Sequence, residues 1–344
     1  MKNSFKKIGG FFQMKKIIGI LLAGALVTSA FAADFSAQVK MKGSLANFDG
    51  TNFKALSMGV DNGADYNQLF ATSVTADKAG SEVKLWLNGD AITTDTFKFK
   101  VWIQPIDMLK LTFGNNNFNL NQESIDWWRS NSDAGESFGY SATITSGAFS
   151  ADIMLGTQSS KDADGNDVDA VGKFWFDGKN FGRTALKVQY GADFGTINAL
   201  FTADNFKDMK FGAGYKGAFG PVNMWANVLA FVNGGFYKVR PELFANGSVD
   251  AFSWAAFVPV DINLGDSVSV VPGLTAKLSY QLASCGIDLY INKGDLTKWG
   301  AAGAIQVRPG VRFNIGSASM EIQADMNIGD GFTVDVPLMC NLSW

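Results

Sequence analysis

Apolar and polar residues alternate one by one over long stretches of this chain. Near its start the apolar set is Phe35, Ala37, Val39, Met41, Gly43 and Leu45, with polar residues between them. At its end Phe332, Val334, Val336, Leu338, Cys340, Leu342 and Trp344 repeat the pattern up to the last residue. A period of two indicates β-strands with one apolar and one polar face, because a helix would repeat every 3.6 residues.

Turn signals divide the alternating stretches into a long series of predicted strands. They span residues 35–46, 66–76, 81–89, 95–104, 108–115, 139–146, 149–156, 170–178, 183–191, 195–203, 209–216, 221–231, 235–245, 249–260, 272–281, 284–292, 302–315, 318–327 and 332–344. The series has an odd number of members, whereas single-chain bacterial barrels contain an even number of strands. At least one segment is therefore wrong, and we expect about 16–18 strands.

The alternation suits a soluble β-sandwich as well as a membrane barrel. The predicted strands are long, however, and a tilted membrane strand needs about 9–11 residues, whereas strands in globular proteins average about 5–6. A chain that ends in an amphipathic strand with a terminal aromatic residue, here Trp344, is typical of the barrel assembly signal. We therefore predict an all-β fold: one transmembrane antiparallel β-barrel.

Tryptophans give a second indication of a barrel. Trp225, Trp254, Trp299 and Trp344 lie near predicted strand ends, which favours an interfacial aromatic belt. Trp86, Trp102 and Trp175 fall instead on the polar positions of their strands. These three either line the barrel interior or mark places where the phase of the alternation shifts.

The first 32 residues have the pattern of a secretory signal peptide. Lys15 and Lys16 precede an apolar stretch at 17–27, and the small-x-small sequence at 30–32 offers a cleavage site. Met14 is an alternative start. The apolar stretch is too short for a membrane-spanning helix, which needs about 20 residues. We expect a signal peptide at 1–32, a barrel at 33–344, and a protein located in the bacterial outer membrane.

Charge and composition exclude several function classes. Of 29 Lys and Arg residues, five belong to the leader, so the mature chain has 24 against 32 acids, a balance of −8. An acidic exported protein is poorly suited to nucleic acid. The chain has no histidine, which excludes Ser-His-Asp triads and histidine bases. We expect no enzymatic activity, no catalytic residues and no cofactor.

Two further features have unremarkable explanations. Cys285 and Cys340 each lie on the apolar face of a predicted strand, where they act as small hydrophobic residues, with a disulfide as the alternative. The segment 161–170 contains four aspartates, a composition that can bind calcium. Counted from Asp162, however, the sixth position of an EF-hand loop, which needs glycine, is Asp167, and the twelfth, which needs glutamate, is Lys173. We therefore expect a solvated acidic loop and no metal site.

Long polar stretches at 47–65, 115–138 and 157–169 contrast with tight links at 77–80, 146–148 and 316–317. Long outer loops and short periplasmic turns are the usual barrel arrangement. Trp127, Trp128 and Arg129 lie in the second long stretch and are candidates for binding a partner. The same residues could instead fold into the pore as a constriction, or anchor in the membrane interface.

One hairpin carries a family resemblance. Residues 97–118 read FKFKVWIQPIDMLKLTFGNNNF: a strand, a Pro-Ile-Asp turn and a second strand that includes a glycine. Together with the signal peptide and the last strand, this hairpin resembles bacterial porin-like barrels, in particular spirochaete outer-membrane proteins. The resemblance implies passive diffusion of small solutes or a surface-antigen role, and it implies no catalytic residues.

The sequence therefore predicts a porin, because barrels of 16–18 strands leave an aqueous channel. Its partners would be outer-membrane lipid, small hydrophilic solutes or ions, the barrel-assembly machinery and, as a possibility, further copies of itself. The alternative is a surface-exposed adhesin or antigen carried on a barrel. Candidate pore-lining residues, among which bases outnumber acids and favour anions, are Lys40, Lys42, Lys84, Lys98, Lys100, Lys187, Lys277, Asp288, Arg308, Arg312, Glu321 and Asp325.

Overall fold

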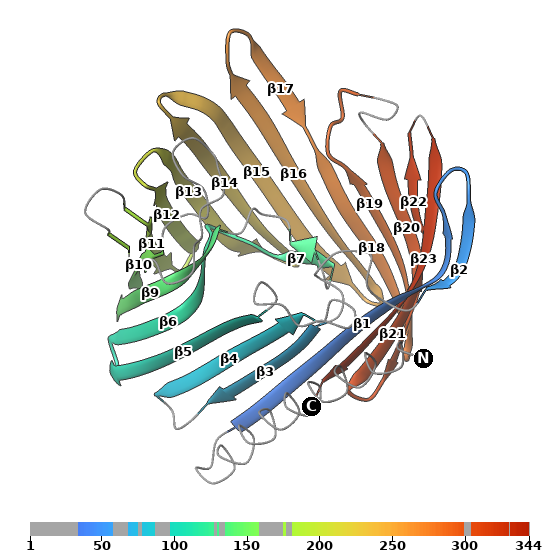
Figure 1. The fold of residues 1–344 in the computed structure, drawn as a ribbon, viewed down its shortest axis with the longest axis horizontal. Helices are drawn as coiled ribbons and strands as arrows, with labels where there is room; N and C mark the ends of the chain where they lie inside the picture. Colours follow the sequence, from blue (N-terminus) through green and yellow to red (C-terminus); the bar gives the residue numbers. More distant parts are fainter. Residues whose placement is uncertain are drawn as a thin grey trace, which may run out of the picture.

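The computed structural model describes residues 34–57, 68–74, 78–86, 97–126, 129–130, 135–157, 175–176, 181–298, 304–329 and 331–343. In these residues the chain forms a ring of antiparallel strands (Figure 1). No helix among them is long and apolar enough to cross a membrane. The predicted signal peptide and the acidic loop at 161–170 lie outside the described residues, as does most of the segment predicted as a strand at 170–178.

Each wall strand pairs with its neighbours in the chain. In order they are β1 (Asp34–Phe48), β3 (Gln68–Val74), β4 (Ala79–Trp86), β5 (Phe97–Ile106), β6 (Leu109–Phe118), β9 (Gly135–Ser146), β10 (Phe149–Gly156), β11 (Arg183–Ala192), β12 (Gly195–Asp204), β13 (Asp208–Phe219), β14 (Val222–Asn233), β15 (Phe236–Val249), β16 (Phe252–Leu264), β18 (Leu274–Leu282), β19 (Cys285–Lys293), β20 (Ile305–Ile315), β21 (Ala318–Gln323) and β23 (Phe332–Ser343). Because β1 pairs with both β3 and β23, the ring is closed.

Three short strands complete this sheet without adding a position to the ring. They are β2 (Phe53–Ser57), β17 (Val268–Pro272) and β22 (Asp325–Ile328). β2 shares the edge of β1 with β3, β17 shares the edge of β16 with β18, and β22 shares the edge of β20 with β21. In the part of the chain that the structure describes, the sheet has 21 strands, of which three share a position with a neighbour, so the wall has 18 positions.

The even strand number expected from the sequence is confirmed, and one predicted strand is wrong. β10 pairs directly with β11, so no wall strand at 170–178 lies between them. Of that segment Trp175 and Phe176 are described, and Phe176 makes an isolated bridge with Phe181. Both of these described residues lie outside the continuous ladder of the wall.

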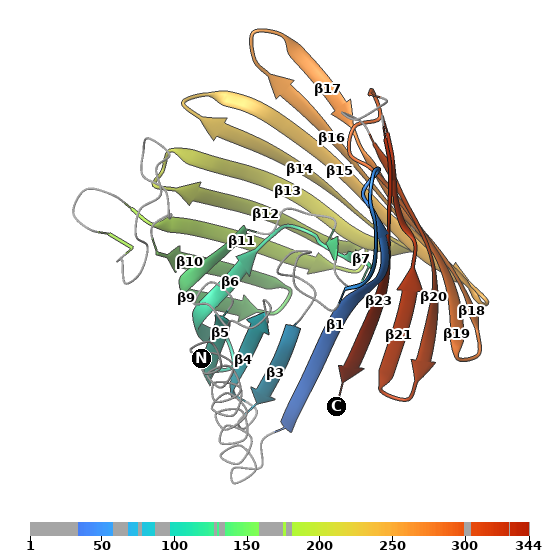
Figure 2. The same ribbon diagram turned by 45° about the vertical axis from the view of Figure 1, so that its right-hand side comes forward.

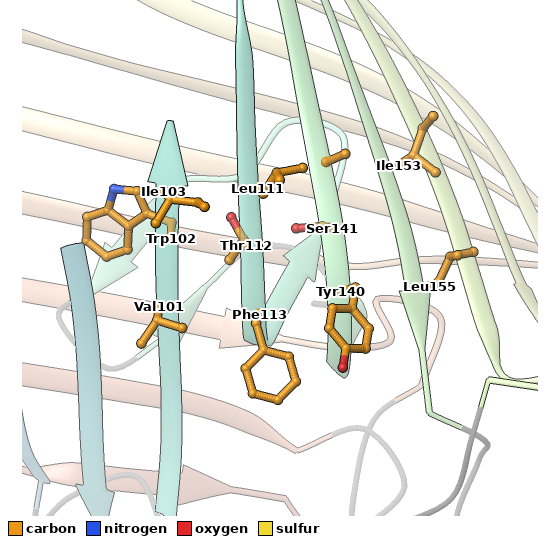
Figure 3. A pocket seen from close by; sticks show the side chains of 11 residues that line it. Val101, Trp102, Ile103, Leu111, Thr112, Phe113, Tyr140, Ser141, Ile153 and Leu155 are labelled. Carbon is orange, nitrogen blue, oxygen red and sulfur yellow. The ribbon is translucent and has the colours of Figure 1, made fainter. Parts of the chain in front are cut away.

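The two faces of the wall differ as the alternation predicts. On β14, Val228 is 52% exposed on the outer face, whereas its neighbour Asn227, which faces the interior, is 2% exposed. The outer face of β5, β6, β9 and β10 carries a shallow apolar groove (Figure 3), lined by Val101, Ile103, Leu111, Phe113, Tyr140, Ile153 and Leu155. An apolar exterior that encloses a polar interior is the arrangement required for a lipid-embedded barrel.

Short turns gather at one end of the barrel. The links between β9 and β10, β13 and β14, and β20 and β21 contain Gly147, Gly220 and Gly316, each with a φ near +60° that glycine adopts without strain. The first residues of β1 pair with the last of β3, and Gln38 pairs with Ser343. The start and the end of the barrel therefore lie at the short-turn end, and the hairpins β1–β2 and β16–β17 lie at the opposite end (Figures 1 and 2).

The prediction of an interfacial position for Trp225 is wrong. Trp225 is 1% exposed and faces the interior, where its ring stacks on Phe244 at 5.4 Å between centroids. Trp102 also faces the interior, where Lys110 Nζ lies 4.9 Å from its ring, as its polar position indicated. Cys285 and Cys340 are both free thiols, in agreement with their interpretation as small hydrophobic residues.

Candidate functional site

The chain enters the barrel after β6. Residues 118–126, here called the inward segment, leave the wall at Phe118 and include β7 (Ser124–Asp126). β7 pairs with the two-residue strand β8 (Arg129–Ser130) and contacts β18 on the far side of the ring. Figures 1 and 2 both show β7 within the ring of wall strands. Of the long stretch predicted at 115–138, residues 115–118 and 135–138 thus belong to the wall strands β6 and β9, and residues 119–126 lie inside the barrel.

Apolar contacts hold the first part of the inward segment to the wall. Phe118 and Leu120 are 7% and 6% exposed and pack on interior residues of neighbouring strands, namely Met154, Ala185, Leu200, Leu229 and Phe231. Burying one Leu or Phe side chain contributes about 1.5–3 kcal/mol. Leucines on the interior face would be exposed to water in an open channel, and the inward segment buries them.

A chain of amide hydrogen bonds follows directly. The Nδ2 of Asn198 donates to the Oδ1 of Asn121 at 2.7 Å, and the Nδ2 of Asn121 donates to the Oδ1 of Asn227 at 3.0 Å. The Nδ2 of Asn227 in turn donates to the Oε2 of Glu242 at 3.2 Å. All four side chains are at least 95% buried. Buried polar groups of this kind stabilise one arrangement because each would be costly without its partner.

Two lysines of the wall make polar contacts with the inward segment, one with its backbone and one with a side chain. Lys187 Nζ donates to the carbonyl oxygen of Leu120 at 3.1 Å, and Lys216 forms an ion pair with Glu123. Lys187 was predicted to line the pore. The structure places it on the interior face of β11 and directs its ammonium group to the inward segment.

An aromatic cluster receives the far part of the inward segment. Ile125 is 5% exposed and packs among Trp225, Phe244, Phe257 and Tyr290. These four aromatic residues come from β14, β15, β16 and β19. The segment is therefore held at three successive places, first by leucines, then by asparagines and last by aromatic rings.

Several predicted pore-lining residues meet around Asp288 on β19. Lys277 Nζ lies 3.8 Å from its Oδ1 and Arg312 Nη1 lies 3.5 Å from its Oδ2, while Ser279 donates a hydrogen bond to it. Asp288 is 2% exposed, but the Arg312 side chain is 28% exposed. The carboxylate is thus buried behind the two cations, which stand nearer the open interior.

A polar cavity of about 390 Å³ opens beside these cations. Ile125 of the inward segment forms one side, and Lys277 and Arg312 form another; further lining residues include Asn223, Asn246, Ser248, Ser253 and Ser279. Its chemistry combines uncharged hydrogen-bonding groups with two positive charges. Such a lining suits a small hydrophilic solute, in particular one that carries negative charge.

The remaining predicted pore-lining residues fall into three groups. The Nε atom of Arg308 lies 3.8 Å from Asp325. Glu321 on β21 is the ladder partner of Arg312 and is 1% exposed. Lys100 pairs with Glu82 at 3.2 Å, whereas Lys98 stands opposite Lys84 in the ladder. Lys40, Lys42 and Lys84 have described backbones, but their side chains lie outside the described part of the structure.

The predicted loop-binding residues remain untested. Trp127 and Trp128 lie outside the described residues, and for Arg129 the structure describes the backbone, which pairs with Asp126 in the ladder of β7 and β8. Sequence reasoning did not find Leu120, Asn121 or Ile125 as functional residues. Nothing in the local pattern marks them, because their partners lie far along the chain.

Neither a protein-family model nor a curated protein sequence matches this chain. Solved structures do. OccAB4 of Acinetobacter baumannii matches with a TM-score of 0.55 at 9% identity, over 91% of this chain and 97% of that one. OpdL of Pseudomonas aeruginosa matches with a TM-score of 0.56 at 8% identity, over 91% and 98%. A BenF-like porin from Pseudomonas fluorescens gives 0.54 at 10%, over 91% and 99%. This chain thus has the fold of bacterial outer-membrane porins.

Proposed function

We propose that the protein is an outer-membrane porin that forms a water-filled channel for passive diffusion of small hydrophilic solutes. One observation carries the proposal: a closed wall of 18 strand positions has an apolar exterior, a polar interior and a chain segment folded inside it. Barrels of 16–18 strands leave an aqueous channel. The fold shared with porins of known structure supports the same function.

The interior favours anions over cations in this proposal. At the Asp288 site the carboxylate is 2% exposed, whereas Arg312 is 28% exposed beside the polar cavity. Glu242 and Glu321 are also nearly fully buried. At the Asp288 site a solute therefore meets the basic side chains before the acidic one, although the chain as a whole is acidic. Rings of basic side chains favour anions in pores.

The first test is single-channel recording of refolded residues 33–344 in a planar bilayer under a salt gradient. Discrete conductance steps and a reversal potential of the sign for anion preference are expected. The variant Arg312→Gln should lower that preference, because it removes one of the cations beside the cavity. A protein that inserts and shows heat-sensitive gel migration, yet gives no steps, would contradict the porin proposal.

A surface-exposed adhesin or antigen is the second candidate. It is favoured by the hairpin of β1 and β2 at the end of the barrel opposite the short turns, where Phe53 is 70% and Leu56 is 76% exposed. Replacing both by serine should abolish attachment to host surfaces in that case and leave conductance unchanged. The finer resemblance of residues 97–118 to spirochaete outer-membrane proteins stays a prediction, as do the assembly-machinery and self-association partners.

A further inference from the structure

Two glycines on β13 face the interior where the inward segment crosses. In the ladder, Gly212 stands between Leu200 on β12 and Leu229 on β14. Two positions along, Gly214 stands between Asn198 and Asn227 of the same strands. The wall thus presents two rows, leucine–glycine–leucine and asparagine–glycine–asparagine, with a gap in the middle of each.

The inward segment fills both gaps with matching chemistry. A Cβ built on Gly212 would lie 2.6 Å from Leu120 Cδ1 and 2.8 Å from Leu229 Cδ2. One built on Gly214 would lie 2.5 Å from the Oδ1 atoms of both Asn198 and Asn227, and 2.8 Å from Asn121 Nδ2. Real Cβ atoms do not approach other atoms so closely. A leucine therefore completes the leucine row, and an asparagine completes the asparagine row.

Backbone geometry does not account for these glycines. Neither Gly212 nor Gly214 has a positive φ, so an alanine could adopt the same backbone conformation. Glycine inside a strand weakens it and often marks a close approach by another part of the chain. The approach seen here is that of Leu120 and Asn121.

We infer that Gly212 and Gly214 are positioning residues that set where the inward segment lies, and thereby the width of the channel. The inference rests on the proposed porin function. The two empty places fix the segment along β13, since moving it by one residue would put either Leu120 against asparagines or Asn121 against leucines, depending on the direction. A side chain at either place would displace the segment toward the middle of the interior or release it from the wall.

The decisive variant is Gly212→Val/Gly214→Val, which fills both places with residues that favour strands. Two readouts are compared with the parent protein: single-channel conductance, and thiol labelling of Ile125→Cys in a Cys285→Ala/Cys340→Ala background. Ile125 is 5% exposed, so its replacement is protected while the segment is in place. We expect labelling to become about tenfold faster as the segment opens, and conductance to change on the order of twofold.

Gly191→Val is the matched control. Gly191 lies on the interior face of β11, where an added Cβ would lie 3.8 Å from the Ala148 carbonyl oxygen. It should leave both readouts unchanged. If the double valine variant does not give a heat-sensitive barrel, Leu120→Ala/Asn121→Ala tests the same contact from the segment side and should speed labelling.

Unchanged labelling and unchanged conductance in a folded variant would overturn the inference. A parent protein that gives no conductance steps would count against the porin function alone, because labelling of the residue at 125 still reports where the segment lies. Faster labelling in the non-conducting protein would support the positioning role of the glycines and contradict the part of the inference that concerns channel width.

Discussion

The guanidinium carbon of Arg308 on β20 lies 3.8 Å from the centre of the Tyr290 ring on β19. The two residues are direct cross-strand partners. Tyr290 also belongs to the aromatic cluster that holds Ile125. One ring therefore contacts a buried cation of the wall and helps to form the site that receives the inward segment.

Replacing Arg308 by alanine should destabilise the barrel strongly. Arg308 is 1% exposed and lies 3.8 Å from Asp325, which is 15% exposed, so the substitution leaves a largely buried carboxylate without a neighbouring cation. Removing one partner of a buried ion pair costs about 3–5 kcal/mol. The measurement is the free energy of unfolding in urea with lipid vesicles.

Arg308→Lys is the control for that prediction. It keeps the charge near Asp325 but loses the planar group that stacks on Tyr290, so an intermediate loss of stability is expected. Equal stability of the alanine variant and the parent protein would show that this contact adds nothing to the fold.

Lys98→Glu should weaken anion preference. Lys98 lies on β5, two residues before Lys100, and both occupy the interior face of the wall. Because basic side chains favour anions in pores, reversing the charge at this position should shift the selectivity toward cations. The measurement is the reversal potential under a salt gradient.

Lys98→Gln serves as the comparison, because it removes the charge without reversing it. Its reversal potential should lie between those of the parent and of Lys98→Glu. A reversal potential that is the same in all three proteins would remove Lys98 from the account of selectivity.

Gly114→Ala should destabilise the barrel through the backbone. Gly114 on β6 has a φ of +121°, and an added Cβ would lie 2.2 Å from the Phe99 carbonyl oxygen and 2.8 Å from Lys100 Cα. The atoms in the way belong to the backbone of β5, which cannot yield as a side chain would. Strain of this kind costs about 1–3 kcal/mol.

The fraction of heat-sensitive, folded protein after refolding and the unfolding midpoint in urea would report this strain. Gly191→Ala provides the reference for a wall glycine whose added Cβ is only in ordinary contact. Equal refolding of the two variants would mean that β5 and β6 adjust to each other at little cost.

Much of the wall could be predicted from the sequence. The alternation at 35–46 and 332–344 indicated two strands, and the structure pairs them as β1 and β23 to close the ring. Tight glycine-containing links at 146–148 and 316–317 marked the short-turn end. The segment 170–178 was misassigned because its aromatic residues imitate a strand when only local composition is considered.

The interior was harder to predict. Trp225 lies near a strand end and fitted an interfacial position, yet it is buried inside beside Phe244. The polar positions identified Lys187, Lys277 and Arg312 as interior residues, but not their partners. Lys187 bonds to a carbonyl oxygen 67 residues away.

The sequence by itself determined the strands, their two faces and a choice of 16 or 18 of them, because a period of two follows from the local geometry of an extended backbone. Only the tertiary structure decided that residues 118–126 lie inside the barrel. That arrangement depends on contacts such as Asn121 with Asn227, which are 106 residues apart. No local pattern reports such a contact, because its stability comes from groups that meet only after the ring has closed.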